Sequence, residues 1–419
     1  MLKVAPLSFC IWFALAAIGR ADQPILVDAA RYAWTQPNIQ TALSVLANAG
    51  AEGLDPDRYR VSLSGDGDRD RTVLTGAVLS YMQELSSGRT DLKVDSDIEL
   101  PARPDDAQAM LYEALKANRL APMLAGLAPS QPGYLALKKA LAEEPDQERR
   151  LILMANMERW RWLPPRPEAD RIEVNAAAAE LTMWLGGREV LSSRVIVGKP
   201  DTRTPILRAE GAGLTINPAW TVPHSIAVKE ILPKLKRNRA WLAKEDMVLL
   251  DGPPDDPHGL HINWRGIPAG TFPYRLRQAP GAKNPLGEIK LELPNRFDVY
   301  LHDTPGKAAF RRVNRAQSHG CIRVEQILPL ATFALAAGPD SMAVIRDAIG
   351  QGQTRYLPLT RKLPIYVVYW TARPGVDGAI EYVPDIYARD ARMIAAMHHQ
   401  PVRIAAIQPS CPTDNLSYR

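Results

Sequence analysis

The sequence is poor in cysteine, with three among 419 residues: Cys10, Cys321 and Cys411. It also lacks any apolar run of about 20 residues beyond its N-terminus, which excludes a polytopic membrane protein. Its 36 prolines are scattered and form no proline-rich tract. With 46% hydrophobic and 23% charged residues, the composition is that of a globular protein long enough for two or three domains.

The N-terminus has the pattern of an export signal. Lys3 precedes a short apolar run over residues 7–18, and small residues at positions 19 and 21 predict cleavage before Asp22. We therefore expect residues 1–21 to be a signal peptide and the mature chain to keep no stable membrane span. A retained membrane anchor is the alternative.

Charge of neither sign dominates the mature chain. Cleavage would remove Lys3 and Arg20 and no acidic residue, so 51 − 2 leaves 49 basic against 46 acidic residues, a net charge of +3. A nearly balanced chain gives no support for nucleic-acid binding, and we expect none.

Only Cys321 and Cys411 would survive cleavage. Two cysteines cannot form a dense disulfide framework, even in an oxidising compartment. Either the two form a single bridge, or Cys321 is a free thiol that is kept for its reactivity.

Helical periodicity dominates the first third of the mature chain. Leu74, Val78, Tyr81 and Leu85 follow one another at i, i+4, i+7 and i+11, which places them on one helix face. Similar stripes predict three further helices, over residues 105–117, 134–141 and 153–160. We expect a helical domain over residues 22–165.

After Pro167 the apolar residues alternate, which is the strand period. Two alternating segments flank Gly186-Gly187, the pattern of a β-hairpin. Further strands are predicted over residues 171–175, 289–293, 297–302 and 363–370. These segments predict a strand-rich domain over residues 166–390, followed by a tail over residues 391–419, and hence an α+β protein.

Residues 224–270 interrupt the strand pattern. Within them, a basic cluster over residues 229–239 surrounds Ile231, Leu232 and Leu235. A solvated helix face explains the cluster, but an insertion of this length between strands usually has a task. A lid over a substrate cleft is the functional alternative.

The most informative residues lie at 300–302 and 318–321. Alternation places Tyr300 and His302 on one strand face, so His302 is expected to project into open space at the strand end. Cys321 is expected in a loop before a helix that runs to Ala337, and a helix N-terminus would favour a thiolate there. An imidazole beside a thiol can take its proton and form an ion pair with it.

The loop before Cys321 is suited to acyl chemistry. Gly320 has no Cβ, so the backbone can approach a substrate there, and the N–H groups of Gly320 and Cys321 are candidate donors to an oxyanion. Ser318 and His319 can orient the loop. A structural cysteine is disfavoured by these polar neighbours, and a metal site of His302, His319 and Cys321 is disfavoured by its spacing.

The order His302, fifteen residues, then Ser318-His319-Gly320-Cys321 resembles the signature of the L,D-transpeptidases, cell-wall cross-linking enzymes with a YkuD-type catalytic domain. Four flanking segments resemble the longer Gram-negative branch of that family, at residues 156–164, 195–200, 225–233 and 274–278. The resemblance implies a helical scaffold domain, then a β-rich YkuD-like catalytic domain with a helical capping insertion at 224–270. The separate peptidoglycan-binding module of long members is missing, because no 60-residue segment fits between the two domains.

The resemblance also implies roles for single residues. Cys321 would be the nucleophile, and His302 the general base and later the acid. His319 and the backbone of Gly320 and Cys321 would shape the oxyanion site. Arg323 would order the loop or meet a substrate carboxylate. Further substrate contacts are assigned to Ser318, Tyr300, Asp303, Trp220 and Tyr274.

The implied activity is that of a periplasmic, cysteine-dependent acyltransferase that forms 3→3 cross-links between peptidoglycan stem peptides. It would need no cofactor and no metal, it would be inactivated by carbapenems, and its partners would be donor and acceptor stems and cell-wall synthesis proteins. A thiol hydrolase on the same scaffold, either an L,D-carboxypeptidase or a lipoprotein–peptidoglycan amidase, stays open, as does a non-enzymatic peptidoglycan-binding scaffold. A bridge would quench the nucleophile, so Cys411 is expected to be free.

Overall fold

The computed structural model describes residues 25–89, 95–101, 106–336, 338, 340–397 and 404–406. The chain divides into two compact units. The first is built from the described parts of Met1–Val94, Asp105–Ala128 and Ala395–Arg419, and the second from those of Asp95–Pro104 and Pro129–Ile394. The predicted signal peptide and Cys411 lie outside the described residues.

Helix α2 (Gly67–Ser87) is the longest helix of the first unit and carries its core. The side chain of Asp66 accepts hydrogen bonds from the first turn, and Gly88 ends the helix with a φ of 72°. All four residues of the predicted stripe, from Leu74 to Leu85, are buried. The predicted amphipathic helix is therefore confirmed.

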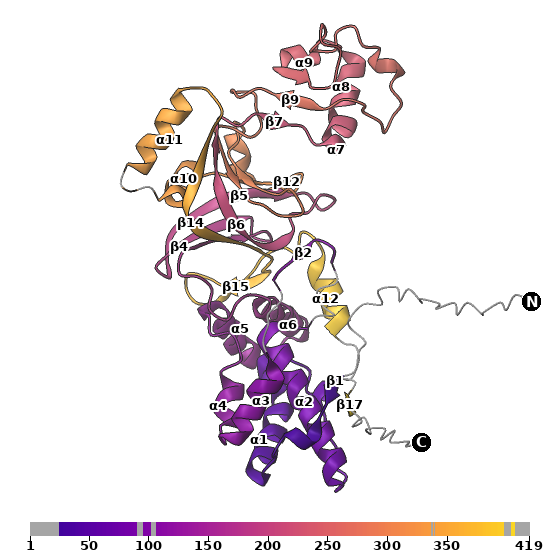
Figure 1. Ribbon diagram of the computed structural model, residues 1–419, viewed down its shortest axis with the longest axis vertical. Helices are drawn as coiled ribbons and strands as arrows, with labels where there is room; N and C mark the ends of the chain where they lie inside the picture. Colours follow the sequence, from indigo (N-terminus) through magenta and orange to yellow (C-terminus); the bar gives the residue numbers. More distant parts are fainter. Residues whose placement is uncertain are drawn as a thin grey trace, which may run out of the picture. The chain divides into compact units, whose positions relative to one another are not determined.

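Shorter elements pack around α2 (Figure 1). The helices are α1 (Gln36–Ala47), α3 (Ala107–Lys116) and α4 (Leu120–Ala125). Short 3₁₀ turns lie at Ala29–Arg31, Ala49–Glu52 and Pro56–Tyr59, and β1 (Ile25–Val27) pairs in parallel with β17 (Ile404–Ala406). Helix α3 agrees with the helix predicted over residues 105–117.

The second unit begins with α5 (Pro132–Glu143) and α6 (Gln147–Arg161), which agree with the two remaining helix predictions. The sequence places both in the helical domain. In the structure they lie in the same compact unit as the strands, where Asn156 of α6 bonds to Thr371 beside β15 (Ala372–Pro374). Trp160 stacks on Trp370 with ring centroids 4.1 Å apart. The predicted domain boundary at residue 165 stays a prediction.

A ten-stranded sheet forms the body of the second unit (Figure 1). The strand order is β10-β11-β13-β5-β4-β3-β14-β6-β2, with β12 paired to β5. Because β10 also pairs with β6, the sheet closes into a barrel. The strands are β2 (Ile98–Glu99), β3 (Arg171–Asn175), β4 (Glu180–Leu185), β5 (Arg188–Gly198), β6 (Ile206–Ile216), β10 (Ile289–Glu292), β11 (Leu301–His302), β12 (Ala316–Ser318), β13 (Ile322–Val324) and β14 (Arg355–Val368).

The predicted hairpin at Gly186-Gly187 is present between β4 and β5. Both glycines have positive φ, 58° and 77°, as a type I′ turn requires. Helix α10 (Ile327–Leu335) packs against β6, β10 and β14, and α11 (Ser341–Gly350) packs against α10. The remaining elements are β15 (Ala372–Pro374), β16 (Ile380–Tyr382) and α12 (Arg389–Met397).

Two predicted elements differ in extent. The strand expected over residues 297–302 is reduced to β11, because Asp298 has a φ of 53° and Asn295 accepts hydrogen bonds from the N–H groups of Phe297 and Val299. The helix expected from Val324 or Glu325 begins at Ile327, because β13 comes first.

The insertion folds into a small layer with its own core. It contains α7 (His224–Ile226), a π-helix at Ala227–Ile231, α8 (Leu232–Arg237), α9 (Trp241–Lys244), β8 (Met247–Leu249) and a 3₁₀ turn at Trp264–Gly266. Two strands flank it, β7 (Trp220–Thr221) and β9 (Leu276–Gln278), and β9 pairs with both β7 and β8. Ile231, Leu232 and Leu235 point into this core. In the described part of the chain, no helix has the length and apolar character needed to cross a bilayer.

Candidate active site

The register of β11 and β13 brings the predicted site residues together. The two strands run parallel, with Leu301 opposite Ile322 and His302 opposite Arg323. Cys321 directly precedes β13 and follows the same register opposite Tyr300. Since side chains alternate along strands, Tyr300, His302, Cys321 and Arg323 share one face. Leu301 and Ile322, both fully buried, point to the other face.

His302 is buried rather than projecting into open space, with 4% of its surface exposed. Its neighbours across the sheet are Lys290 on β10 and Arg323 on β13, which enclose it from both sides. Its Nδ1 lies 2.5 Å from the carbonyl oxygen of Asp303. A carbonyl can only accept, so Nδ1 donates, and the neutral ring keeps Nε2 as its free proton acceptor.

The surroundings keep His302 neutral. Burial and the positive charges of Arg323 and Lys290 lower the pKa of His302 to about 3. Burial raises the pKa of the Cys321 thiol, despite hydrogen bonding by Tyr300 and the positive charges of Lys290 and Arg323. The resting pair is therefore a thiol and a neutral imidazole, not the ion pair expected from the sequence. No helix N-terminus offsets this, since α10 starts beyond β13.

Cys321 is a free, partly exposed thiol. Its Sγ lies 3.7 Å from the carbonyl oxygen of Asp298, to which the S–H donates a weak hydrogen bond. The polar neighbourhood and the accessible sulfur are those of a reactive rather than a structural cysteine.

The side chain of Ser318 bonds to the backbone of its own loop. Its hydroxyl donates to the carbonyl of Cys321 at 2.6 Å and accepts from the N–H of Gly320 at 3.1 Å. Ser318 is only 2% exposed, so it orients the loop rather than meeting a ligand. The N–H of Gly320 is therefore engaged, and the expectation that it is an oxyanion donor is wrong for this conformation. The N–H of Cys321 has no acceptor among the described residues and remains the candidate donor.

Residues 198–204, after β5, support the loop from the other side, which the sequence did not reveal. The hydroxyl of Thr204 donates to the carbonyl of Gly320 at 2.8 Å and accepts from the N–H of Gly198 at 2.9 Å. The hydroxyl of Thr202 donates to the carbonyl of Ser318 at 3.1 Å. The only sequence signal was the resemblance of residues 195–200 to the family.

His319 links the loop to the capping insertion. Its Nε2 lies 2.7 Å from a carboxylate oxygen of Glu230, which belongs to the π-helix of the insertion. Both side chains remain partly exposed, at 35% and 42%. In this arrangement Nε2 of His319 is occupied, and the insertion touches the catalytic loop directly.

Positive charge collects around the sulfur. The buried Nε of Arg323 has no hydrogen-bond partner in the described part of the chain. The ammonium of Lys290 lies over the ring of Tyr300 and pairs with Glu292 at 2.8 Å. Lys290, Glu292 and Tyr300 line a pocket of about 220 Å³. Asp298, whose carbonyl contacts Cys321, also lines it.

Three predicted substrate contacts lie elsewhere or serve the fold. Trp220 and Tyr274 pack against the core of the insertion. Asp303 is buried, accepts a hydrogen bond from the N–H of Glu288 at 3.0 Å and pairs with Lys307. Across residues 25–397 as described, no group of three or more His, Cys, Asp or Glu side chains is placed to hold a metal ion.

Comparisons with known proteins agree with this geometry. Residues 169–345 match the model of the L,D-transpeptidase catalytic domain, YkuD, and residues 25–141 match that of the Scaffold domain. A Haemophilus influenzae protein named "Putative L,D-transpeptidase" is 32% identical over 241 residues, which is 58% of this chain and 48% of the relative. The chain thus spans about half the length of this curated relative.

Two solved structures are also similar. An L,D-transpeptidase from Mycobacterium smegmatis is 14% identical, covering 48% of this chain and 58% of that chain, with a TM-score of 0.23. An Enterococcus faecium L,D-transpeptidase is 12% identical, covering 77% and 99%, with a TM-score of 0.22. The two family models place a Scaffold domain at the N-terminus of the chain and, after it, an L,D-transpeptidase catalytic domain of the YkuD type, the domain of a cysteine transpeptidase.

Proposed function

We propose that the protein is a periplasmic L,D-transpeptidase that forms 3→3 peptidoglycan cross-links through a thioester on Cys321. The observation that supports this most is the shared face of β11 and β13. It carries the partly exposed Cys321 and a buried, neutral His302 whose Nδ1 is fixed by the carbonyl of Asp303.

Acylation begins with a neutral pair. The sulfur of Cys321 attacks the carbonyl at the L-centre of meso-diaminopimelate in the donor stem, and its proton passes to Nε2 of His302. The N–H of Cys321 donates to the developing oxyanion. The C–N bond then breaks, His302 returns the proton to the leaving amine, and D-Ala departs. A thioester remains on Cys321.

Deacylation reverses these proton movements. The side-chain amine of a second stem attacks the thioester carbonyl and gives its proton to His302. The C–S bond breaks, the sulfur is reprotonated, and an amide joins the two stems. One amide is exchanged for another, so no cofactor is required. Arg323 and Lys290 supply the positive charge that a carboxylate-bearing stem peptide needs.

Incubation of the purified protein with tetrapeptide muropeptides tests the acceptor. Cross-linked dimers and released D-Ala are expected from the wild type, and neither from Cys321→Ala. Tripeptide monomers without dimers would overturn cross-linking and identify an L,D-carboxypeptidase with water as the acceptor.

Intact-protein mass after meropenem treatment tests the nucleophile. We expect one adduct on the wild type and on Cys411→Ala, and none on Cys321→Ala. N-terminal mass of the protein recovered from a periplasmic fraction tests export, with Asp22 as the expected first residue.

A further inference from the structure

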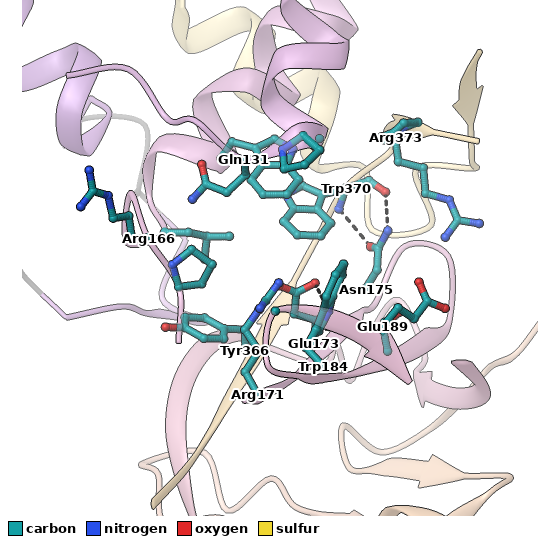
Figure 2. A pocket seen from close by; sticks show the side chains of 18 of the residues that line it. Gln131, Arg166, Arg171, Glu173, Asn175, Trp184, Glu189, Tyr366, Trp370 and Arg373 are labelled. Carbon is teal, nitrogen blue, oxygen red and sulfur yellow. Dashed lines mark hydrogen bonds and ion pairs between the residues drawn. The ribbon is translucent and has the colours of Figure 1, made fainter. Parts of the chain in front are cut away.

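A second pocket, of about 540 Å³, lies in the same unit and shares no lining residue with the active site. Its volume is within the range of small-molecule binding sites. Figure 2 shows its two sides: Gln131 and Trp370 line one, and Arg171, Glu173, Trp184 and Tyr366 line the other.

The sheet provides the floor of the pocket. On β3, Ile172 and Val174 are fully buried, so Arg171, Glu173 and Asn175 occupy the opposite face. Thr182 and Trp184 of β4 lie opposite Glu173 and Arg171 in register and continue this face. The outer face of these strands is therefore polar and aromatic, and it is hollowed rather than covered by apolar side chains.

Tryptophans dominate the walls. Trp160 and Trp370 stack in nearly parallel planes, 10° apart. Gly133 lies against this pair, since a Cβ at that position would come within 2.3 Å of the Trp160 ring. Trp184 is held upright by its Nε1–H, which donates to Glu173 at 2.9 Å, and by the guanidinium of Arg171, 4.3 Å from its ring centroid.

The charges that line the pocket balance. Three arginines and three glutamates are present: Arg166, Arg171, Arg373, Glu173, Glu180 and Glu189. Arg171 pairs with Glu173 at 2.6 Å, and Arg373 pairs with Glu180. Arg166 and Glu189 form no ion pair within the described residues, and the buried Oε1 of Gln131 has no hydrogen-bond partner there. The guanidinium donor of Arg166, the carboxylate acceptor of Glu189 and the amide oxygen of Gln131 thus remain around an aromatic wall.

We propose that this pocket binds a neutral oligosaccharide, the glycan strand of the peptidoglycan that the proposed function assigns as substrate. A sugar ring has a face of C–H groups that packs on an indole, and a rim of hydroxyls that bond to carboxylate, guanidinium and amide groups. A charged stem peptide would need a wall of net opposite charge, which the balanced lining does not provide. The pocket would add a contact to the glycan outside the active site.

Binding of chitotetraose, a peptide-free N-acetylglucosamine oligomer, tests the proposal without using the reaction. Isothermal titration is carried out on the full chain carrying Cys321→Ala, so no acyl transfer interferes. We expect binding that weakens at least tenfold in Trp184→Ala and is largely restored in Trp184→Phe. The matched control is Leu185→Ala, which changes the next, exposed residue of the same strand outside the pocket.

Two variants that each remove one charge complete the test, one inside the pocket and one outside it. Glu189→Gln is expected to weaken chitotetraose binding about fivefold, and Arg188→Gln, outside the pocket, to leave it unchanged. No binding, or binding equal in Trp184→Ala and Leu185→Ala, would overturn the proposal. So would a stem peptide without sugar whose binding depends on Trp184. Introduced alone, Trp184→Ala should still form the meropenem adduct and still dimerise short muropeptides. If the wild type itself formed neither the adduct nor dimers, that result would contradict the proposed function and not the glycan site.

Discussion

At the scale of single residues, the neutral state of His302 decides how the site responds to pH. A base is active only when unprotonated, and an ordinary imidazole loses this state as the pH falls through about 6.5. Burial and the positive charges of Arg323 and Lys290 lower the pKa of His302 to about 3. Between pH 5 and 8 the base is therefore fully available.

Acylation by meropenem should show this directly. We expect its rate constant to have no acid limb between pH 5 and 8 in the wild type. Arg323→Gln removes one of the charges that lower the pKa of His302, so an acid limb should move upward toward that range. Arg277→Gln, on β9 in the insertion, is the control. An acid limb near pH 6.5 in the wild type would contradict the neutral pair.

Thr204 supports the catalytic loop through one hydroxyl that joins two buried backbone groups, the carbonyl of Gly320 and the N–H of Gly198. Thr204→Val keeps the shape but leaves both groups unpaired, at about 1–3 kcal/mol each. We expect a fall in unfolding free energy of about 2–6 kcal/mol in urea titrations and a meropenem acylation rate lowered more than tenfold.

Thr202→Val is the matched control for this change. The carbonyl of Ser318, its acceptor, also receives the N–H of Lys199 at 3.0 Å, so one partner remains. The unfolding free energy of Thr202→Val should therefore fall by less than about 1.5 kcal/mol. Equal falls in unfolding free energy in Thr204→Val and Thr202→Val would show that the two hydrogen bonds of the Thr204 hydroxyl stabilise the protein no more than the single one of Thr202.

The residues of the site differ in how far the sequence predicts them. Cys321 and His302 stand out because a thiol among Ser, His and Gly is unsuited to an apolar core, and because their spacing matches a family signature. Thr204 carries no such signal, since a threonine after a strand has many ordinary explanations. Its role depends on a contact with Gly320, 116 positions along the chain, which local patterns do not encode.

At the scale of elements, local signals predicted turns and amphipathic helices well. The hairpin at Gly186-Gly187 follows from two residues that accept positive φ, and α2 follows from an apolar stripe of four residues over about three turns. The three-residue strand β13 was missed because it is too short to show a period, and its Ile322 and Val324 also fit the helix that follows. Consequently the sequence predicts a loop and then a helix N-terminus shortly after Cys321, where the structure has a strand.

Gly198, at the end of β5, is an element boundary with a strict requirement. A Cβ there would lie 2.0 Å from the carbonyl oxygen of Thr202, a backbone atom that cannot rotate away. Gly198→Ala must therefore displace residues 198–204, which hold the catalytic loop. We expect a meropenem acylation rate at least tenfold lower and a clearly reduced unfolding free energy.

Gly186→Ala offers the comparison within the same sheet. Gly186 has a φ of 58°, but an added Cβ would meet nothing within 4 Å. Only left-handed backbone strain applies, about 1–2 kcal/mol. We expect reduced stability with an unchanged acylation rate, measured by urea titration and by intact mass over time. A slower acylation in Gly186→Ala would contradict this separation of stability from catalysis.

At the scale of the whole molecule, the sequence predicted neither the closure of the barrel nor the unit to which helices α5 and α6 belong. The pairing of β10 with β6 closes the barrel across more than 70 residues of chain, and register over such a span is set by packing rather than by local pattern. Helices α5 and α6 were predicted as helices, yet their membership of the strand-rich unit depends on contacts such as Asn156 with Thr371, at 2.8 Å. Periodicity indicates that a helix has an apolar face, not which face it covers.

A lid over a cleft is the functional alternative for the insertion at 224–270, which contacts the catalytic loop through Glu230 and His319. Because both partners are partly exposed, the pair contributes at most about 1 kcal/mol. A contact of this size can break often, and it controls access to Cys321 only if breaking it uncovers the sulfur.

Glu230→Gln tests this directly, because the neutral amide keeps the shape and loses the charge. We expect the rate of Cys321 alkylation by iodoacetamide, followed by intact mass, to rise about two- to fivefold, the factor that 1 kcal/mol allows. The unfolding free energy should stay within about 0.5 kcal/mol of the wild type, since the core of the insertion is untouched. Asp255→Asn, an exposed change elsewhere in the insertion, should alter neither quantity. A rate unchanged or lowered in Glu230→Gln would mean that the insertion does not screen the sulfur through this pair, and access would then be set by the catalytic loop alone.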